Sequence, residues 1–148
     1  MFNPQHIRPP HYFQALLVLA TVIELILRPE RVVGPAWLGL LPVVAGFVIV
    51  LQGKKLFDTK RTPVRHSEAP SALVTGGLFK YTRNPMYVGI ELFLCGIALM
   101  IGTWPFLCVP AAMFLILQLI FIPWEEKIME RLFGQEYNEY RKRVRRWL

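Results

Sequence analysis

The sequence is poor in charged residues and in cysteine. Charged residues make up 18% of the 148 residues and hydrophobic residues 54%, whereas soluble domains usually carry about 25% charged residues. The two cysteines, Cys95 and Cys108, lie inside apolar runs, and there is no CxxC motif and no His/Cys cluster with metal-ligand spacing. We therefore expect no metal site, and we interpret the two thiols as small buried apolar groups.

Motifs for dinucleotide binding and for nucleophilic catalysis are missing as well. The glycines of the segment Thr75–Gly77 lack the GxGxxG spacing of a dinucleotide-binding turn. No Ser/His/Asp set is evident either. These absences argue against Rossmann-type cofactor binding and against triad-type hydrolysis.

The positive charge of the chain is distributed around apolar runs. The net charge is +7 and the mean hydropathy is +0.39. Basic residues that flank apolar segments are typical of proteins beside an anionic membrane surface. A nucleic-acid-binding protein would instead gather them into one patch or stripe. The sequence therefore predicts an integral membrane protein that does not bind nucleic acid.

Long uncharged runs divide the chain into candidate membrane spans. The first is Tyr12–Leu27, the second is Val32–Gly53, and no charge occurs from Leu92 to Trp124. A span needs about 20 residues, so the last run is too long for one helix. The N-terminal run has no small-x-small cleavage site, and we expect it to remain as a span.

The segment GTWP, Gly102–Pro105, divides the last run. Gly stops a helix, Thr103 can cap the next one, and a Pro fits a first helical turn. We expect two helices, about Pro85–Ile101 and Trp104–Ile122, which lie side by side as a tight antiparallel hairpin. Pro123 is expected to end the second of them.

The predicted fold is an all-α integral membrane protein with four transmembrane helices and a cytoplasmic C-terminal helix. Seven Lys and Arg residues lie in 54–83 and seven follow Trp124, whereas the first connection has only Arg28 and Arg31. The positive-inside rule therefore places both termini in the cytoplasm. We expect a single membrane domain, 1–148. Its parts are the first two spans (1–53), a cytoplasmic connector (54–84), the hairpin (85–123) and an amphipathic tail (124–148).

The tail is expected to be helical, with a break at Gly134. Apolar and aromatic side chains recur at helical spacing and charged residues fill the opposite face. Two interpretations remain open. The helix lies on the lipid head groups, or it covers a site at the cytoplasmic face.

The segment YTRNPMY, 81–87, precedes the third expected helix with polar residues. Asn84 is a good N-cap and Pro85 fits the first helical position. The free N–H groups of the helix start, together with Arg83, would form an anion site. The alternative is that Asn-Pro merely starts the helix and that Arg83 contacts lipid phosphate.

An acidic pair, Glu125 and Glu126, follows the fourth expected helix. Acids at a helix start are stabilising by themselves. In an antiparallel hairpin, however, this pair returns to the membrane face where the third helix begins. We therefore expect Arg83, Asn84 and Tyr87 to lie near Glu125 and Glu126, in a cleft suited to a zwitterionic or hydroxyl-rich ligand.

Two further features are candidates. In the segment SALVTGGLF, 71–79, Gly76 and Gly77 allow the backbone to approach a ligand closely. Glu91 lies one turn after Tyr87, and an acid inside a membrane span marks a functional site by default. Alternatively, the Glu91 side chain simply reaches water at the membrane interface and has no functional role.

These segments together resemble the isoprenylcysteine carboxyl methyltransferase family, which includes bacterial integral-membrane relatives; phospholipid N-methyltransferases are similar. The resemblance rests on LVTGGLFKYTRNPMYVG, an apolar hairpin, EE, FGQEYNEYRKRV and RW, and it covers about 62–148. It implies a methyltransferase of the bacterial inner membrane that uses S-adenosylmethionine. It also implies a cytoplasmic cofactor pocket and a lipid or membrane-soluble small-molecule acceptor that enters from the bilayer.

Carried over residue by residue, the resemblance implies which side chains form the site. Methyl transfer needs approach geometry and a dry pocket more than a nucleophilic side chain. From the chemistry of the residues themselves, we expect Arg83, Glu126 or Glu91 to orient the acceptor as the catalytic residues. The residues implied to bind the cofactor are Ser71, Ala72, Leu73, Val74, Phe79, Asn84, Pro85, Met86, Tyr87 and Glu125.

The chain departs from the family's pattern at three places. The prenylcysteine enzymes have His at the positions of Asn84 and Ser71, and they place an Arg near the end of the fourth span, where 118–124 has no cation. The missing cation favours an uncharged or amine acceptor. The expected reaction is O-methylation of a carboxylate, with phospholipid amine methylation as the alternative. A non-catalytic carrier or assembly subunit is the alternative of another class. The sequence does not indicate an oligomeric state.

Overall fold

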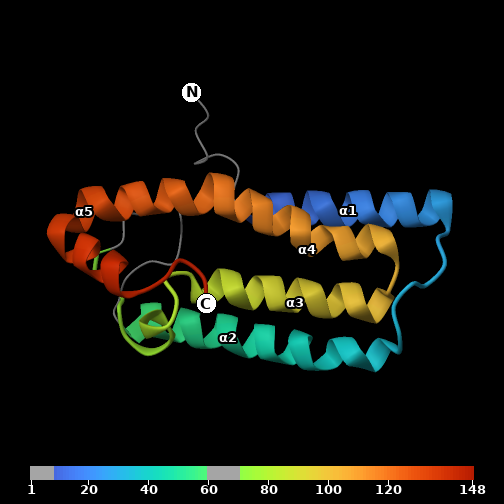
Figure 1. The fold of residues 1–148 in the computed structure, drawn as a ribbon, viewed down its shortest axis with the longest axis horizontal. Helices are drawn as coiled ribbons and strands as arrows, with labels where there is room; N and C mark the ends of the chain where they lie inside the picture. The colour runs from blue at the N-terminus through green and yellow to red at the C-terminus, as the bar shows by residue number, and fades with distance from the viewer. Residues whose placement is uncertain (1–8, 60–70) are drawn as a thin grey trace.

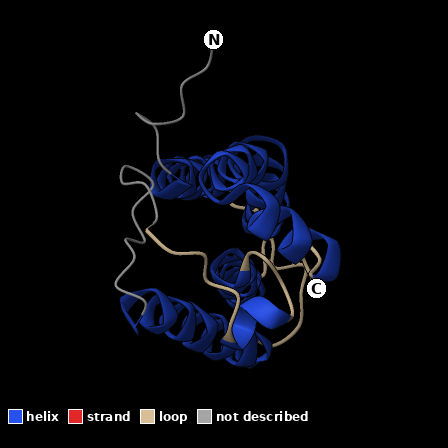
Figure 2. Ribbon diagram, turned by 90° about the vertical axis from the view of Figure 1, so that its left-hand side faces the viewer, coloured by secondary structure: helices blue, strands red, loops and turns tan. Residues whose placement is uncertain are grey.

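A computed structural model describes residues 9–59 and 71–148, which form helices and connecting turns without any strand (Figures 1 and 2). The residues 60–70 of the predicted connector lie outside the described part. The helices are α1 (Pro9–Leu27), α2 (Leu40–Thr59), α3 (Pro85–Ile101), α4 (Trp104–Ile116) and α5 (Ile122–Arg143). Short 3₁₀ turns occupy Ala36–Gly39 and Gly77–Lys80, and a π-helical turn, Leu117–Phe121, joins α4 to α5.

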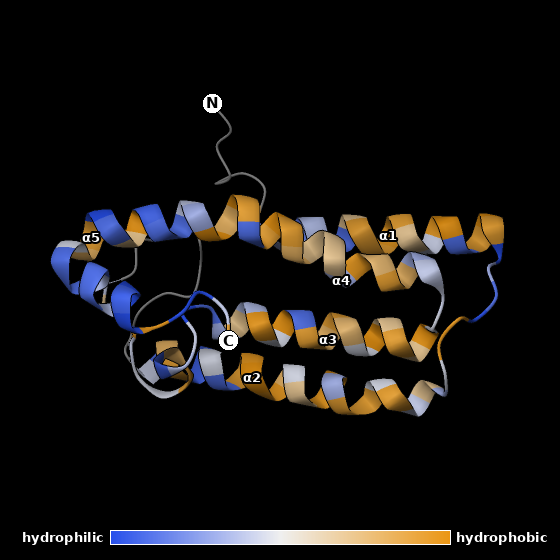
Figure 3. Cartoon of the chain, in the orientation of Figure 1, coloured by the Kyte–Doolittle hydropathy of each residue, from blue (hydrophilic) through white to orange (hydrophobic). Residues whose placement is uncertain are grey.

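The membrane character of the helices is confirmed by their length and composition. Three helices are long and apolar enough to cross a membrane, namely Pro9–Leu27, Ala36–Thr59 and the combined helix Trp104–Arg143. The helix Pro85–Ile101 is apolar but shorter. Figure 3 shows hydrophobic residues along α1 to α4, whereas hydrophilic residues gather on α5 and the neighbouring loops.

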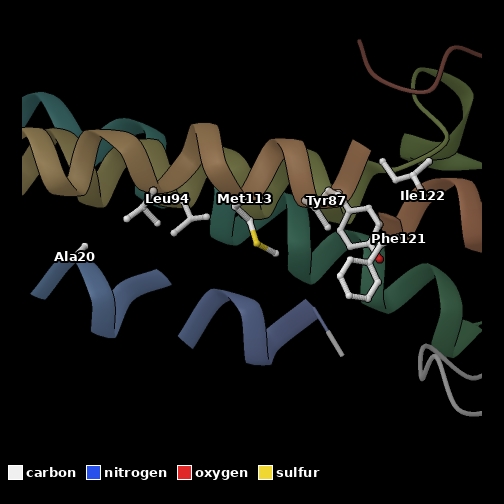
Figure 4. Close-up of a cluster of buried hydrophobic side chains, with 8 residues drawn as sticks. Ala20, Tyr87, Leu94, Met113, Phe121 and Ile122 are labelled. Carbon is white, nitrogen blue, oxygen red and sulfur yellow. The ribbon is translucent and has the colours of Figure 1, made fainter. Parts of the chain in front are cut away.

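The helices pack in an order that differs from their order in sequence. α1 packs on α4, α4 on α3, and α3 on α2 (Figure 1). Gly102 ends α3 in the left-handed conformation with φ of 78°, so that α4 starts two residues later and runs back along α3. The main core cluster lies between α1, α3 and α4 and includes Leu94, Met113 and Phe121 (Figure 4).

The expectation that Pro123 ends the fourth helix is wrong, because the chain stays helical from Trp104 to Arg143. A Pro lacks the backbone N–H and its ring clashes with the carbonyl four residues earlier. Here Pro123 directly follows the π-helical turn and stands at the start of α5. In that turn the Ile122 N–H bonds to the Leu117 oxygen, five residues earlier, so the hydrogen-bond ladder is already shifted where the Pro stands. The break predicted at Gly134 is confirmed by its φ of 48° and ψ of −118°.

Glycines bring α2 and α3 into close backbone contact. Gly39, Gly46 and Gly53 follow one another at intervals of seven residues, and Gly89 and Gly96 have the same spacing on α3. Seven residues are about two helical turns, so the glycines of each helix share a face. A Cβ atom placed on Gly89 would lie 2.8 Å from the backbone oxygen of Gly46. This is the small-residue packing by which membrane helices associate.

At the far end of the bundle, Arg31 connects the α1–α2 segment to the end of α3. Its guanidinium donates to the backbone oxygens of Leu99, Met100 and Ile101 at 2.7–3.0 Å. These are carbonyls that a helix end leaves without partners. Thr103 occupies the N-cap position of α4, as predicted, but its side chain makes no capping hydrogen bond, and its hydroxyl donates to Glu24 at 2.7 Å instead.

Substitution of Gly96 by Ala is expected to destabilise the fold. The new Cβ would lie 2.6 Å from the backbone nitrogen of Val43 and 2.7 Å from the oxygen of Gly39, and such overpacking costs about 1–3 kcal/mol. That cost exceeds the roughly 1 kcal/mol that Ala gains over Gly in a helix. The melting temperature in detergent should fall for Gly96→Ala. The control is Gly76→Ala, because Gly76 has φ of −92° and nothing within 4 Å of an added Cβ; equal melting temperatures for both variants would contradict this packing.

Candidate functional site

The start of α3 is organised by Thr82 rather than by the side chain of Asn84. Asn84 occupies the N-cap position and Pro85 the first helical position, as predicted, but the Asn84 side chain makes no capping hydrogen bond. Its backbone has φ of −128° and ψ of 53°, which is not the usual cap conformation. The hydroxyl of Thr82 instead accepts from the Asn84 backbone N–H at 3.2 Å. The expected capping role of the Asn84 side chain is therefore wrong.

Glu126 lies between two guanidinium groups. Arg83 donates to its Oε1 at 2.6 Å, and Arg146 donates to Oε2 at 2.6 Å and to Oε1 at 3.1 Å. The side chains of Arg83 and Glu126 are only 11% and 13% exposed. Burial alone would raise the pKa of Glu126, but the hydrogen bonds and charges of Arg146 and Arg83 outweigh it and lower that pKa. Glu126 is therefore a fixed negative charge at neutral pH.

The neighbouring acid, Glu125, contacts the first turn of α3. The hydroxyl of Tyr87 donates to Glu125 Oε1 at 2.6 Å. Tyr87 is 8% exposed and lies beside Phe121 in the core (Figure 4). The predicted approach of Arg83 and Tyr87 to the acidic pair is thus confirmed by two short contacts to α5, one from the segment before α3 and one from the first turn of α3.

The C-terminal strap, which we define as residues 144–148, runs back across the start of α3 (Figure 1). Arg83 donates from its backbone nitrogen to the oxygen of Arg145 at 2.9 Å and from Nη1 to the oxygen of Val144 at 2.6 Å. Thr82 and Asn84 both donate side-chain hydrogen bonds of 3.0 Å to the backbone oxygen of Arg146. The polar groups of the helix start therefore bind the strap.

The segment of α5 after the break covers the loop 71–80. Tyr140 donates to the backbone oxygen of Phe79 at 2.7 Å, and Val74, Phe79, Tyr137 and Tyr140 form a second buried cluster. Burial raises the pKa of Tyr137 to about 12 and also raises the pKa of Tyr140. This contact favours the interpretation in which the tail covers a site at the polar end of the bundle over the one in which it lies on the lipid head groups.

Other predicted residues lie apart from these contacts. Ser71 is exposed, and Ala72 and Leu73 are half-buried. Met86 faces α2, where a Cβ added to Gly53 would lie 2.6 Å from its Cγ. The buried Oε1 of Glu91 accepts no hydrogen bond within the described residues. The structure shows no contact between Glu91 and the acidic pair among these residues.

Sequence reasoning missed four residues of this region, Thr82, Arg146, Trp147 and Gln118. Trp147 donates from its indole nitrogen to Gln118 at 2.7 Å, and it packs on the main core cluster. Arg145 and Arg146 follow other basic residues of the tail. The local sequence therefore does not show that Arg146 forms an ion pair while its neighbours are solvated. Only the return of the strap places it on Glu126.

A cavity of about 300 Å³ lies between α1, α2, α3 and α4. Its lining is entirely apolar and includes Pro10, Phe47, Ile90 and Met113. Such a space suits a hydrocarbon chain and not a charged cofactor. The candidate site therefore lies at the polar end of the bundle, around Arg83 and the acidic pair.

Comparison with known proteins agrees with the sequence signature. Residues 35–136, more than half of the chain, match the family described as phospholipid methyltransferase. The chain belongs to the phospholipid methyltransferase family. The chain is similar to two probable protein-S-isoprenylcysteine O-methyltransferases of Oryza sativa, one from subspecies indica and one from subspecies japonica. It is 32% identical to each of them over 120 residues. This family match and these relatives confirm the resemblance stated above.

The match to these phospholipid methyltransferase relatives is partial in length. It covers 74% of this chain and 58% of each rice protein, so the chain spans little more than half the length of those relatives. The protein-S-isoprenylcysteine O-methyltransferase of Schizosaccharomyces pombe is 36% identical over 76 residues, which are 49% of this chain and 30% of that protein. No solved structure matches the chain significantly.

Removal of the charge on Glu126 is expected to destabilise the folded protein. Breaking a buried ion pair by removing one partner costs about 3–5 kcal/mol, so Glu126→Gln should lower the melting temperature at pH 7. The control is Glu130→Gln, because Glu130 is 46% exposed and its oxygen lies 3.9 Å from Arg141.

The pH dependence follows from the lowered pKa of Glu126. A folded pKa below the unfolded value means that this stabilisation is present above about pH 4.5 and is lost as the pH falls through the folded pKa. The difference in melting temperature between wild type and Glu126→Gln should therefore be constant above about pH 4.5 and should shrink below it. A difference that grows on acidification would contradict the assignment.

Proposed function

We propose that this protein is a membrane methyltransferase that uses S-adenosylmethionine and methylates a lipid-like acceptor. One observation carries the proposal, together with the family to which the chain belongs. The signature segment at the start of α3 and the acidic pair of α5 meet through Tyr87–Glu125 and Arg83–Glu126, both at 2.6 Å. Neither contact caps α3, because the Arg83 guanidinium and the Tyr87 hydroxyl donate to carboxylates of α5 and not to the backbone of the helix start.

The residues present suit a zwitterionic methyl donor. The Nε atom of Arg83 is buried and has no hydrogen-bond partner within the described residues, and such an atom is costly unless a partner arrives. A guanidinium N–H group matches the carboxylate of the donor. Glu125, on the same side, offers an acceptor for an ammonium or hydroxyl group. We propose a donor pocket formed by Ser71–Val74, Phe79, 84–87 and Glu125.

The bound donor would supply a methyl group from a sulfonium centre. The protein's own part is to bind, orient and exclude water, because an in-line displacement depends mainly on approach geometry. Phe79 and Tyr87 are 6% and 8% exposed and would provide apolar walls. Arg83, Glu126 and Glu91 are the proposed acceptor-orienting residues. Two arginines already hold Glu126 in place through hydrogen bonds. The Oε1 atom of Glu91, in contrast, has no hydrogen-bond partner within the described residues.

The acceptor is proposed to enter from the bilayer. The relatives are named as protein-S-isoprenylcysteine O-methyltransferases, whereas the family is named for phospholipid methylation. Carboxylate O-methylation is our first candidate reaction. Phospholipid amine methylation is the second, and the absence of Lys and Arg from 118–124 favours it, because a neutral amine needs no cationic group to bind it.

The proposed topology has four spans with both termini in the cytoplasm. Helices α1 to α4 each cross the membrane, and α5 leaves it near Trp124, where the hydrophilic part of the helix begins (Figure 3). The strap and the donor pocket then lie on the cytoplasmic face of the inner membrane. The Lys and Arg distribution supports this orientation.

Glu125→Gln is expected to weaken donor binding without unfolding the protein. Loss of a charged hydrogen-bond partner costs about 1.5–3 kcal/mol, which is roughly a 10- to 150-fold increase in the dissociation constant. The dissociation constant is measured by calorimetry with S-adenosylmethionine on detergent-purified protein. Glu130→Gln is the control variant. Incubation of membranes with the labelled donor, followed by lipid extraction, tests the reaction itself. Unchanged affinity in folded Glu125→Gln protein would remove Glu125 from the pocket.

The topology is testable with reporter fusions. A reporter placed after Leu148 should be cytoplasmic, and one placed within Arg28–Gly34 should lie on the opposite side, because four spans put the first connection outside. Alkaline phosphatase and green fluorescent protein fusions report the two sides. The same side for both positions would overturn the four-span topology.

A further inference from the structure

The π-helical turn contains the one amide side chain of the apolar stretch 104–124, Gln118. π-helical turns are rare and occur often at functional sites. An amide placed among apolar side chains is unfavourable unless its polar atoms are hydrogen-bonded. Gln118 lies seven residues before Glu125, about 10 Å along the helix toward the membrane interior. It is thus a polar group at membrane depth close to the proposed site.

The C-terminal strap fixes the orientation of this amide. Trp147 donates from Nε1 to Gln118 Oε1 at 2.7 Å, and the Trp147 ring lies on Phe114 with ring centroids 4.9 Å apart. An indole nitrogen can only donate, so the oxygen of Gln118 must face Trp147 and the NH₂ group must point away from it. The direction of the amide therefore follows from its partner.

The NH₂ group of Gln118 has no hydrogen-bond partner among the residues that the structure describes. Its neighbours in the turn, Leu117 and Phe121, are 0% and 1% exposed and fill the core, while Gln118 is half-buried beside them. The result is a neutral hydrogen-bond donor on a half-buried side chain, held in one orientation beside the apolar core. Such a group favours a ligand that brings an oxygen atom to it.

We propose that the amide nitrogen of Gln118 recognises the head group of the methyl acceptor by donating to one of its oxygen atoms, and that Trp147 is the positioning residue that holds this amide. The inference rests on the proposed function. It names the acceptor as an amphiphile whose head group carries a hydrogen-bond-accepting oxygen near the methylated atom. Because the strap also binds Glu126 and Asn84, it connects the acceptor-recognising group to the donor pocket.

Two variants separate recognition from a merely structural latch. Gln118→Met and Trp147→Phe both break the Gln118–Trp147 hydrogen bond, but Trp147→Phe keeps the amide nitrogen and an aromatic ring on Phe114. A latch alone predicts equal effects of the two. Recognition predicts that Gln118→Met raises the acceptor KM about tenfold, which is the usual effect of one lost hydrogen bond. Trp147→Phe should raise the acceptor KM clearly less than Gln118→Met does. Leu119→Met, at a residue that is 69% exposed, is the control.

The experiment uses the full chain in detergent, with labelled S-adenosylmethionine and two acceptor probes. The probes are N-acetyl-S-farnesylcysteine and mixed micelles of phosphatidylethanolamine. We measure acceptor KM, kcat, donor dissociation constant and melting temperature on the same preparations. The expected result is a raised acceptor KM for Gln118→Met with a donor dissociation constant within about twofold of wild type.

The outcomes distinguish the inference from the function on which it rests. Equal acceptor KM values for Gln118→Met and Trp147→Phe, in a wild type that methylates a probe, overturn the role of Gln118 and leave the function standing. Wild-type protein that binds no donor overturns the proposed function, and the inference falls with it. Donor binding without methylation of either probe overturns the acceptor class, and with it the recognition by Gln118.

Discussion

The arrangement of the polar end of the bundle depends on one buried carboxylate. Glu126 accepts hydrogen bonds from Arg83, which precedes α3, and from Arg146, which belongs to the strap. Three segments that are far apart in sequence therefore meet at a single negative charge. Without this carboxylate the largely buried guanidinium of Arg83, which is 11% exposed, would lose its charge partner, and so would the more exposed guanidinium of Arg146. The proposed donor pocket lies beside this ion triad, so its shape depends on the same contact.

The position of that carboxylate depends in turn on how the chain leaves the membrane. A helix that stopped at Pro123 would have freed the acidic pair into a loop. The π-helical turn at Leu117–Phe121 instead carries the helix past Pro123, and a rigid helix places Glu125 and Glu126 at defined distances from α3. The close glycine packing of α3 on α2 holds the other side of the site. Backbone geometry in the membrane thus sets side-chain geometry at its surface.

Local rules predicted much of the fold. Asn84 and Pro85 set the start of α3 and Gly102 its end, because capping and left-handed turns have short-range signals. The glycine spacing on α2 and α3 was also present in the sequence and would have predicted their close packing. The Thr103 side chain does not cap α4, for a long-range reason. Its hydroxyl donates to Glu24 of another helix. A local sequence pattern carries no information about a partner so distant in sequence.

What the sequence alone determined is the helical membrane character, the bounds of α3 and the meeting of the segment 81–87 with the acidic pair. Each follows from composition, helix periodicity or the antiparallel return of a short turn. Only the tertiary structure decided which acid pairs with which residue, and only it brought Arg146 and Trp147 back onto the site. The reason is that a strap after a helix break has many possible paths, and its path is selected by buried partners distant in sequence.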